Sequence, residues 1–302
     1  MIHKPVLLKE VIELLDIKPD GIYLDATVGG GGHAYEIAKR LQNGLLIGLD
    51  WDAQALEYAR RCLKPFKDKV KLIQANFRDL EGVLEGLDID QADGMLFDLG
   101  LSSIHLDTPQ RGFSFRRDGP LDMRMDRENN SLTAAEIVNT YSRDELIKIL
   151  KEYGEERWAP RIANVIIEAR RQRPLETTCQ LAELVTGAIP AAARRKMKIH
   201  PATRTFQALR IEVNDELENL RLSLEAGFRR LALGGMIVVI SFHSLEDRIV
   251  KRFFYAKAGK GTYLGERLKE AELFKLVRPS SGEIAANPRA RSAKLRVARK
   301  VI

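Results

Sequence analysis

Short apolar runs alternate with amphipathic segments along the first hundred residues of the chain. The runs predict strands at Ile22–Ala26, Leu45–Leu49, Val70–Ile73 and Met95–Leu99. Apolar residues at helical spacing predict the intervening helices, at Ala34–Leu41, Ala53–Leu63 and Leu80–Leu87. This order of strands and helices is typical of a parallel sheet that helices cover on both faces.

The alternation stops near Asp107, and no strand pattern follows as far as His200. The predicted helices there are Thr133–Thr140, Arg143–Tyr153, Pro160–Arg171 and Thr178–Ile189. The stretch Ser131-Leu132-Thr133, with Glu136 in the first turn that follows, is expected to supply the cap of the first of them. Beyond Asn214 the pattern predicts a helix at Glu216–Leu233, a strong strand at Met236–Phe242, a helix at Leu245–Tyr255 and weaker strands at Phe274–Val277 and Leu295–Ile302.

These elements predict one α/β sheet domain that an all-helical insertion interrupts. An open sheet of four short strands lacks its other half, and the apolar run Met236–Phe242 supplies a buried central strand. We assign residues 1–106 and 207–302 to the sheet domain and residues 107–206 to the helical insertion. Two domains in sequence are the alternative.

The composition allows a large core and favours a polyanionic partner. The chain has 302 residues, 45% of them hydrophobic, and a net charge of +7. Cys62 and Cys179 lie far apart without a CxxC pattern, so we expect neither a disulfide framework nor a zinc site, and a reducing cytosol. We find no signal-peptide pattern at the N-terminus and no apolar stretch near the ~20 residues of a membrane span.

A glycine-rich junction, DATVGGGGHA, follows the first predicted strand. Gly29, Gly31 and Ala34 satisfy the G-x-G-x-x-G/A pattern between a strand and a helix, where free amides can hold a ligand. Asp50 ends the second strand, where a carboxylate can bind the two hydroxyls of a ribose. Together these features predict an adenosine-containing cofactor. The alternative is that the glycines only allow the helix to pack closely on the strand. Asp52 is the expected cap of the next helix.

The nature of the cofactor depends on residues around the glycines. No Lys-Ser/Thr follows them, which excludes a phosphate-binding P-loop. Asp25 would oppose the pyrophosphate of NAD but suits an ammonium group, so S-adenosylmethionine is favoured over NAD. His33 either binds the carboxylate of the cofactor or caps the turn. Phe77, after the third strand, either stacks on adenine or packs in the core.

A candidate reaction centre lies at the end of the fourth strand, in LFDLGLSS, where Asp98 stands at a ligand-binding edge. Taken together with other motifs, this stretch makes the chain resemble the bacterial ribosomal RNA small-subunit methyltransferase H family, also called MraW. The resemblance rests on motifs in one order over almost the whole chain: DATVGGGGHA, LFDLGLSS, RGFSFRRDGPLDMRMD, YGEERWAPRIA, HPATRTFQALRI, SFHSLEDRIVKRFF and NPRARSAKLR.

The resemblance implies a Rossmann-like class I methyltransferase sheet with an inserted helical domain. It implies S-adenosylmethionine-dependent methylation of N4 of one cytidine in the decoding region of 16S rRNA. The RNA is expected within the 30S subunit, and naked rRNA stays open as the alternative substrate. By the resemblance, the cofactor contacts are Gly32, His33, Ala34, Asp50, Phe77, Asp98 and His105. The last position departs from the family, since many relatives have glutamine in SSPQLD where this chain has SSIHLD.

The chemistry of such a reaction can be argued from the residues themselves. The lone pair of a cytosine amino group is delocalised, so transfer needs an acceptor for its N–H groups and alignment with the methyl donor. We assign Asp98 as that acceptor. The strand end lacks the Pro-Pro-Tyr of many amino-methylating enzymes, so an aromatic platform must come from elsewhere; the candidates are Phe113, Phe115, Phe242 and His243.

Two motifs have structural alternatives to a functional role. Ser241 and His243 are candidate substrate contacts, and the alternative for SFHSLED is a helix start capped by Ser244. Three aspartates, Asp118, Asp122 and Asp126, alternate with arginines, which favours charge-paired loop packing over a metal site. Methyl transfer needs no metal.

Two basic stretches without acidic residues predict RNA contacts. The first contains Arg194, Arg195, Lys196, Lys198, Arg204 and Arg210; the second contains Arg289, Arg291, Lys294, Arg296, Arg299 and Lys300. A solvated charged face is the alternative for each. An NAD-dependent oxidoreductase and a non-catalytic RNA-binding protein stay open as rival functions, and so does the oligomeric state.

Overall fold

The computed structural model describes residues 5–261 and 269–302, which form two compact units. The first unit contains Met1–Ser102 and Leu217–Ile302, and the second is Ser103–Glu216. Residues 1–4 and 262–268 of the predicted sheet domain lie outside the described residues. The second boundary follows helix α11 (Thr203–Asn214), which packs on other helices of the second unit, whereas the sequence-based boundary at 206/207 would divide this helix.

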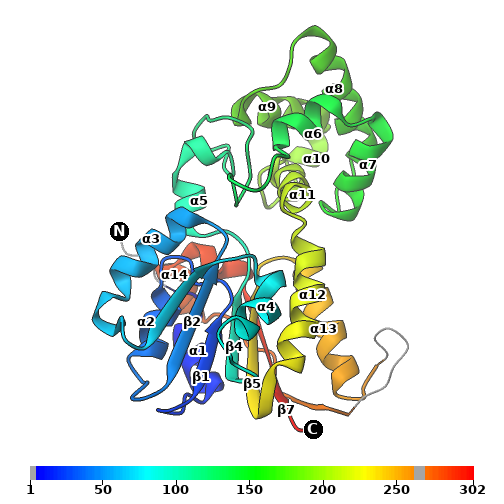
Figure 1. Cartoon of the computed structure of the whole chain (residues 1–302). Helices are drawn as coiled ribbons and strands as arrows, with labels where there is room; N and C mark the ends of the chain where they lie inside the picture. Colours follow the sequence, from blue (N-terminus) through cyan, green and yellow to red (C-terminus); the bar gives the residue numbers. More distant parts are fainter. Residues whose placement is uncertain (1–4, 262–268) are drawn as a thin grey trace. The chain divides into compact units, whose positions relative to one another are not determined.

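The first unit contains a seven-stranded sheet in the order β3-β2-β1-β4-β5-β7-β6 (Figure 1). The strands are β1 Ile22–Asp25, β2 Leu45–Asp50, β3 Val70–Gln74, β4 Ala92–Asp98, β5 Leu231–Ser241, β6 Ala271–Leu273 and β7 Lys294–Lys300. The pairs among β1 to β5 are parallel, and β7 is antiparallel to β5 and β6. The predicted α/β class is therefore confirmed, with β5 as a buried inner strand.

Helices cover both faces of this sheet, as the hydrophobic pattern predicts (Figure 1). One face is covered by α1 Leu8–Leu15, α2 Gly32–Ala38 and α3 Ala53–Cys62, and the other by α4 Leu80–Glu85, α12 Glu216–Arg229 and α13 Ser244–Lys257. Gly227 of α12 permits close approach, because a Cβ there would lie 3.2 Å from the Met95 sulfur of β4. The short elements η1 Lys64–Phe66, η2 Phe77–Asp79, α14 Ser281–Ala286 and η4 Pro288–Ser292 complete the unit.

Two predicted boundaries in the first unit are wrong. The helix expected to reach Leu233 ends at Arg229, and β5 begins at Leu231. A register shift lets Ala92 pair with Leu231 and Gly94 with Met236, and Gly234 has a φ of 79°. The strand expected at Phe274–Val277 lies earlier, at Ala271–Leu273, and only an isolated bridge joins Val277 to β7.

The second unit is helical. Its elements are α5 Ser103–Asp107, η3 Pro109–Arg111, α6 Ala134–Thr140, α7 Arg143–Glu152, α8 Ala159–Gln172, α9 Thr178–Ala188, α10 Ala191–Arg194 and α11. Within the stretch expected to supply the cap, Thr133 caps α6 by accepting a hydrogen bond from the Glu136 amide. Among the described residues, no strand falls between β4 and β5. No helix in the described part of the chain is long and apolar enough to span a membrane.

Candidate cofactor-binding and catalytic site

Three aspartates stand at the carboxyl ends of neighbouring strands in the first unit. Asp25 ends β1, Asp50 ends β2 and Asp98 ends β4, and β1 lies between the other two strands. Because parallel strands end at one edge of a sheet, the three carboxyl groups gather where open α/β sheets bind ligands. Residues from three separate sequence motifs therefore meet at one place.

Asp50 holds the glycine loop between β1 and α2. Its Oδ2 accepts a hydrogen bond from the Gly29 amide at 2.9 Å, and its Oδ1 accepts one from the Asp52 amide, also at 2.9 Å. Glycine is needed at Gly29 and Gly31, where φ is 51° and 86°. A Cβ at Gly31 would also lie 3.3 Å from the Ala59 Cα. Asp50 thus shapes the loop as well as standing at the ligand-binding edge.

His33 is buried at the start of α2 and links two other parts of the unit. Its side chain is tied to the N-terminal segment, since Nε2 lies 3.0 Å from the Val6 carbonyl oxygen. Its Nδ1 lies 3.5 Å from Asp98 Oδ2. The residue that caps α2 is Gly31, so His33 does not cap the turn. Of the two roles weighed for His33, a contact with a ligand remains a prediction.

The predicted contacts Gly32 and Ala34 flank His33 and are tightly enclosed. A Cβ at Gly32 would lie 2.4 Å from Cγ of Pro5, and Ala34 is completely buried. The loop is more open one residue earlier, where a Cβ at Gly30 would meet no atom within 4 Å. Free space over the glycine loop therefore lies near Gly30.

Burial and like charge raise the pKa values of two of the three aspartates. Burial raises the pKa of Asp25 to about 7, and the charge of Asp50 adds to the shift, although the Thr27 amide donates to Asp25 Oδ1. Burial also raises the pKa of Asp98 well above its ordinary value, and the charges of Asp25 and Glu246 add to this. Asp98 Oδ1 is buried with no hydrogen-bond partner among the described residues. A cationic ligand would offset this concentration of negative charge.

Phe77 lies mainly in the core. It starts η2 and is 8% exposed, with its ring centroid 6.0 Å from that of Trp51 and 6.2 Å from that of Phe97. The predicted core role is confirmed. Its contact with adenine stays a prediction, which the small exposed part of the ring permits.

The end of β5 lies beside the end of β4, because Asp98 pairs with Ile240 in the parallel register. Gly100, after β4, has a φ of 96°, and a Cβ there would lie 3.3 Å from the Phe242 ring. Ser241 is 2% exposed, and its Oγ donates to the Lys294 carbonyl. The motifs LFDLGLSS and SFHS are therefore adjacent in space.

His243, not Ser244, is the cap of α13. The His243 ring accepts a hydrogen bond from the Glu246 amide, and Glu246 Oε2 accepts from the amides of Phe242 and His243. The expected Ser244 cap is wrong because this reciprocal capping box places Ser244 inside the first turn. Glu246 is itself buried, and its charge acts on Asp98.

Sequence reasoning missed two groups that position Asp98 and His33. The Asp98 amide donates to Thr27 Oγ1 at 2.6 Å, which fixes the end of β4 against the loop after β1. The Val6 carbonyl orients the His33 ring. Thr27 stands in the DAT motif and could have been found there, whereas a backbone carbonyl leaves no signal in the sequence.

The remaining predicted contacts His105, Phe113 and Arg204 belong to the second unit. His105 is buried in α5, with its ring centroid 4.9 Å from that of Phe113, which is itself 6% exposed. Arg204 of α11 donates from Nη1 to the Glu155 carbonyl at 2.9 Å. His105 and Phe113 thus form one aromatic pair within the helical unit.

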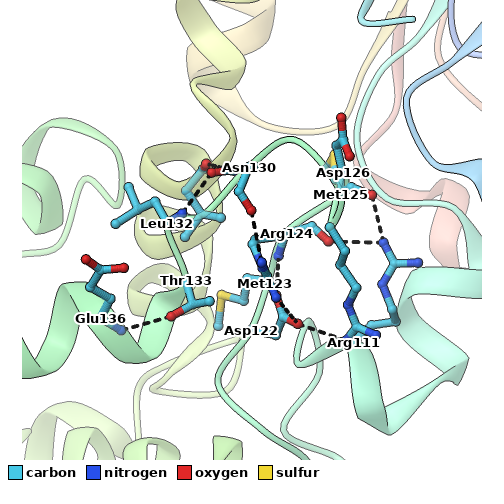
Figure 2. A network of polar contacts seen from close by, with 12 residues as sticks. Arg111, Asp122, Met123, Arg124, Met125, Asp126, Asn130, Leu132, Thr133 and Glu136 are labelled. Carbon is cyan, nitrogen blue, oxygen red and sulfur yellow. Dashed lines mark hydrogen bonds and ion pairs between the residues drawn. The ribbon is translucent and has the colours of Figure 1, made fainter. Parts of the chain in front are cut away.

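An ionic network shapes the loop that follows Phe113 (Figure 2). Asp122 accepts from Arg124 Nε at 2.7 Å and pairs with Arg127 at 2.9 Å. Burial opposes ionisation of Asp122, but hydrogen bonds and charge from these arginines lower its pKa. Arg111 Nη2 donates to the carbonyls of Arg124 and Met125. The arrangement supports the predicted charge-paired packing over a metal site.

The structure divides the two basic stretches into structural and exposed residues. In the first stretch, Arg210 forms a buried double hydrogen bond with Glu216. In the second, the basic residues of β7 are occupied, since Lys294 and Arg296 pair with Asp247, Arg299 pairs with Glu272, and Lys300 donates to two carbonyls. Arg289 and Arg291, on η4, are exposed. Charge counting along the sequence therefore overstates the basic surface.

Four features together define a class I, S-adenosylmethionine-dependent methyltransferase. They are the order of the sheet, the antiparallel strand β7, the glycine loop after β1 and the acids at the strand ends. The chain belongs to the MraW methylase family, which matches residues 1–301.

Curated relatives match along nearly the full chain. The protein is 49% identical over 310 residues to ribosomal RNA small subunit methyltransferase H of Halothermothrix orenii, covering 99% of each chain. It is 52% identical over 304 residues to the protein of the same name from Symbiobacterium thermophilum, covering 97% of this chain and 95% of the relative. An rRNA methylase of Streptococcus thermophilus aligns in structure with a TM-score of 0.46 and 12% sequence identity, over 100% of this chain and 99% of that one.

S-adenosylmethionine fits the residues at this edge of the sheet. The molecule has no pyrophosphate, and it carries an ammonium and a sulfonium group. Positive charge suits the cluster of Asp25, Asp50 and Asp98, and the buried Oδ1 of Asp98 offers an acceptor. The open space at Gly30 leaves the backbone there accessible to a ligand.

The pKa of Asp25 predicts that cofactor affinity depends on pH. A cation prefers the ionised carboxyl, and burial holds the pKa of Asp25 at about 7. We expect the affinity for S-adenosylmethionine to rise about tenfold from about pH 6 to about pH 8. Isothermal titration calorimetry measures this. The Asp25→Asn variant is expected to bind weakly with a flat pH dependence, and an equally steep dependence in the variant would contradict the assignment.

The same carboxyl has the opposite effect on the stability of the cofactor-free protein. Its pKa is 3.8 without perturbation and about 7 in the fold, so the folded state binds more protons between these values. The contribution of Asp25 to stability is therefore present at low pH and is lost as the pH rises through 7. Asp25→Asn removes this loss, and thermal melts on either side of neutrality test it.

Proposed function

We propose that the protein transfers a methyl group from S-adenosylmethionine to N4 of one cytidine in the decoding region of 16S rRNA. The reaction takes place in the cytoplasm, with the RNA assembled in the 30S subunit. The names of the relatives support a small-subunit rRNA substrate. The observation that carries the N4 assignment is Asp98, whose buried Oδ1 has no hydrogen-bond partner in the described part of the chain.

The chemistry of an exocyclic amino group calls for such an acceptor. When bound, S-adenosylmethionine supplies a methyl group on a positively charged sulfur. Asp98 Oδ1 accepts a hydrogen bond from N4, which localises the amino lone pair and aligns it for attack. The Thr27 contact holds the Asp98 backbone in place, and the Oδ1 atom itself is buried from water. A carboxyl oxygen at this point suits an N–H group better than a ring carbon, whose C–H group is only a weak hydrogen-bond donor.

We assign the cofactor-binding role to the glycine loop and its neighbours: Gly32, His33, Ala34, Asp50, Phe77, Asp98 and His105. The helical unit recognises the RNA. Aromatic Phe113 is the candidate platform for the extruded base, and Arg204, Arg289 and Arg291 are candidate phosphate contacts. Ser241 and His243, next to the end of β4, are further candidate contacts.

Mass mapping of 16S rRNA from cells with and without the protein tests the proposal. We expect one methyl group on a cytidine of the decoding region to disappear with the protein and to return on re-expression. Chromatography of the released nucleoside against standards distinguishes N4-methylation from methylation of a ring carbon or the ribose. An unchanged methylation pattern would overturn the proposal.

Reactions with purified components separate the substrate and the rival functions. We expect the protein to methylate 30S subunits and to methylate naked 16S rRNA much more slowly. Binding of NADH without binding of S-adenosylmethionine would instead indicate an oxidoreductase. RNA binding without methylation of either substrate would indicate a non-catalytic protein.

A further inference from the structure

The contacts of His33 determine which nitrogen of its ring carries hydrogen. A carbonyl oxygen only accepts hydrogen bonds, so the 3.0 Å contact with Val6 requires hydrogen on Nε2. In the neutral ring, Nδ1 then carries a lone pair, and it is this atom that lies 3.5 Å from Asp98 Oδ2. His33 is 5% exposed, so water does not compete freely for either nitrogen. The ring is thus oriented with its basic atom toward Asp98.

The two oxygens of Asp98 have different surroundings. Oδ2 is the atom near His33, and Oδ1 has no hydrogen-bond partner within the described residues. The distance of 3.5 Å is long for a hydrogen bond, and such contacts commonly shorten when substrate binds. One carboxyl group therefore carries both an oxygen close to a buried histidine ring and a buried oxygen without a hydrogen-bond partner among the described residues.

The charges around this pair favour retention of a proton. Asp25 of β1 and Glu246 of α13 both act on Asp98 with negative charge, and Asp50 of β2 adds to the charge of Asp25. This negative charge disfavours the ionised form of Asp98, whose Oδ2 lies beside the His33 ring.

We propose that His33 is a positioning residue that shares a proton with Asp98 Oδ2 and receives it when Asp98 Oδ1 deprotonates N4 of the cytidine. This inference rests on the proposed function. The N4 lone pair forms the N–C bond, while the C–S bond of the methyl donor breaks and its electron pair stays on sulfur. The N4 proton moves to Oδ1 and the shared proton moves to Nδ1. Asp98 ends neutral, and His33 ends as an imidazolium that still donates from Nε2 to Val6.

The test begins with the protein alone, without turnover. In ¹⁵N-histidine NMR spectra, we expect the His33 Nε2 signal of a protonated nitrogen and a Nδ1 signal intermediate between the protonated and unprotonated forms. The Asp98→Asn substitution is expected to move Nδ1 to the fully unprotonated position. A wild-type Nδ1 signal that Asp98→Asn leaves unchanged would overturn the pairing. Because no methylation is measured, this result is independent of the proposed function.

The second arm measures kcat at saturating cofactor and 30S subunits. His33→Gln keeps an amide donor for the Val6 carbonyl but cannot take up a proton, so we expect kcat to fall about a hundredfold. The acid limb of its pH profile is expected to move to higher pH, since the positive partner of Asp98 is gone. Tyr35→Phe, on the same helix and outside the site, is the matched control and should behave as wild type.

Two outcomes of the second arm would overturn the proposal. One is a His33→Gln variant with the wild-type kcat. The other is a variant with reduced kcat and an unshifted pH profile, which a purely structural role would produce. Thermal melts of His33→Gln and Tyr35→Phe show whether both variants fold. If wild-type protein methylates no substrate, the proposed function fails, while the NMR result still decides the pairing.

Discussion

Replacement of Asp98 by alanine is expected to lower kcat for methylation about a thousandfold. On the proposed mechanism, the variant loses the carboxyl group that aligns N4 and takes its proton. Asp98→Asn is expected to be intermediate, because its amide oxygen accepts a hydrogen bond but holds a proton poorly. Single-turnover methylation of 30S subunits measures the chemical step separately from product release.

The same substitutions are expected to stabilise the cofactor-free protein above neutral pH. The pKa of Asp98 is raised by burial, so the ionised form is less stable in the folded protein than in the unfolded chain. Asparagine at this position carries no charge and should melt at a higher temperature. Glu57→Gln, on the surface of α3, is the control and should change neither activity nor melting. Wild-type methylation by Asp98→Ala would disprove the catalytic assignment.

Replacement of a functional carboxyl group is expected to lower activity but raise stability, whereas replacement of a structural carboxyl group lowers stability. Asp247 is also largely buried, but Lys294 and Arg296 lower its pKa, so its charge stabilises the fold. Asp25 and Asp98 instead keep destabilising charges at the edge of the sheet. A protein retains such an arrangement when a ligand compensates for it.

The sequence predicted the first four strands, the parallel sheet and the acids at the strand ends because these depend on short-range patterns. Apolar runs of strand length and the glycine loop can be read directly, and parallel strands bring Asp25, Asp50 and Asp98 together. Elements that depend on distant partners were missed. Helix α1 begins after Leu7, whose φ is 54° and whose amide donates to Glu283, more than two hundred residues away.

The limits of prediction at the site have the same physical origin. Arg210 does not contribute to the basic surface because it pairs with Glu216. The orientation of the His33 ring depends on the backbone carbonyl of Val6. The Val6 carbonyl leaves no signal in the pattern of side chains. Glu216 is one of several acids close to Arg210 in the sequence, so the pattern does not single it out as the partner. The boundary between α12 and β5 was predicted too late in the sequence. The register shift that lets β5 begin at Leu231 depends on its pairing with Ala92 of β4, which the sequence of β5 does not show.

Replacement of Asn214 by alanine is expected to destabilise the helical unit by about 3 kcal/mol. Asn214 is 4% exposed at the end of α11. Its Nδ2 donates to the carbonyls of Met123 and Arg210, each at 2.8 Å, and its Oδ1 accepts from the Met125 amide at 2.8 Å. Met123 has a φ of 62°, a conformation that needs support from its surroundings. Alanine leaves these buried backbone groups without the amide that joins them.

The consequence for function follows from where this amide acts. Asn214 and the network of Asp122 and Arg124 (Figure 2) fix the loop that follows Phe113, while the cofactor residues at the strand ends belong to the first unit. We expect Asn214→Ala to lose methylation of 30S subunits yet to bind S-adenosylmethionine with nearly wild-type affinity. Calorimetric melting and cofactor titration measure the two effects. Asn164→Ala, which removes one exposed hydrogen bond with Arg143 in the same unit, is the control. Parallel loss of cofactor binding in Asn214→Ala would contradict this separation of the two effects.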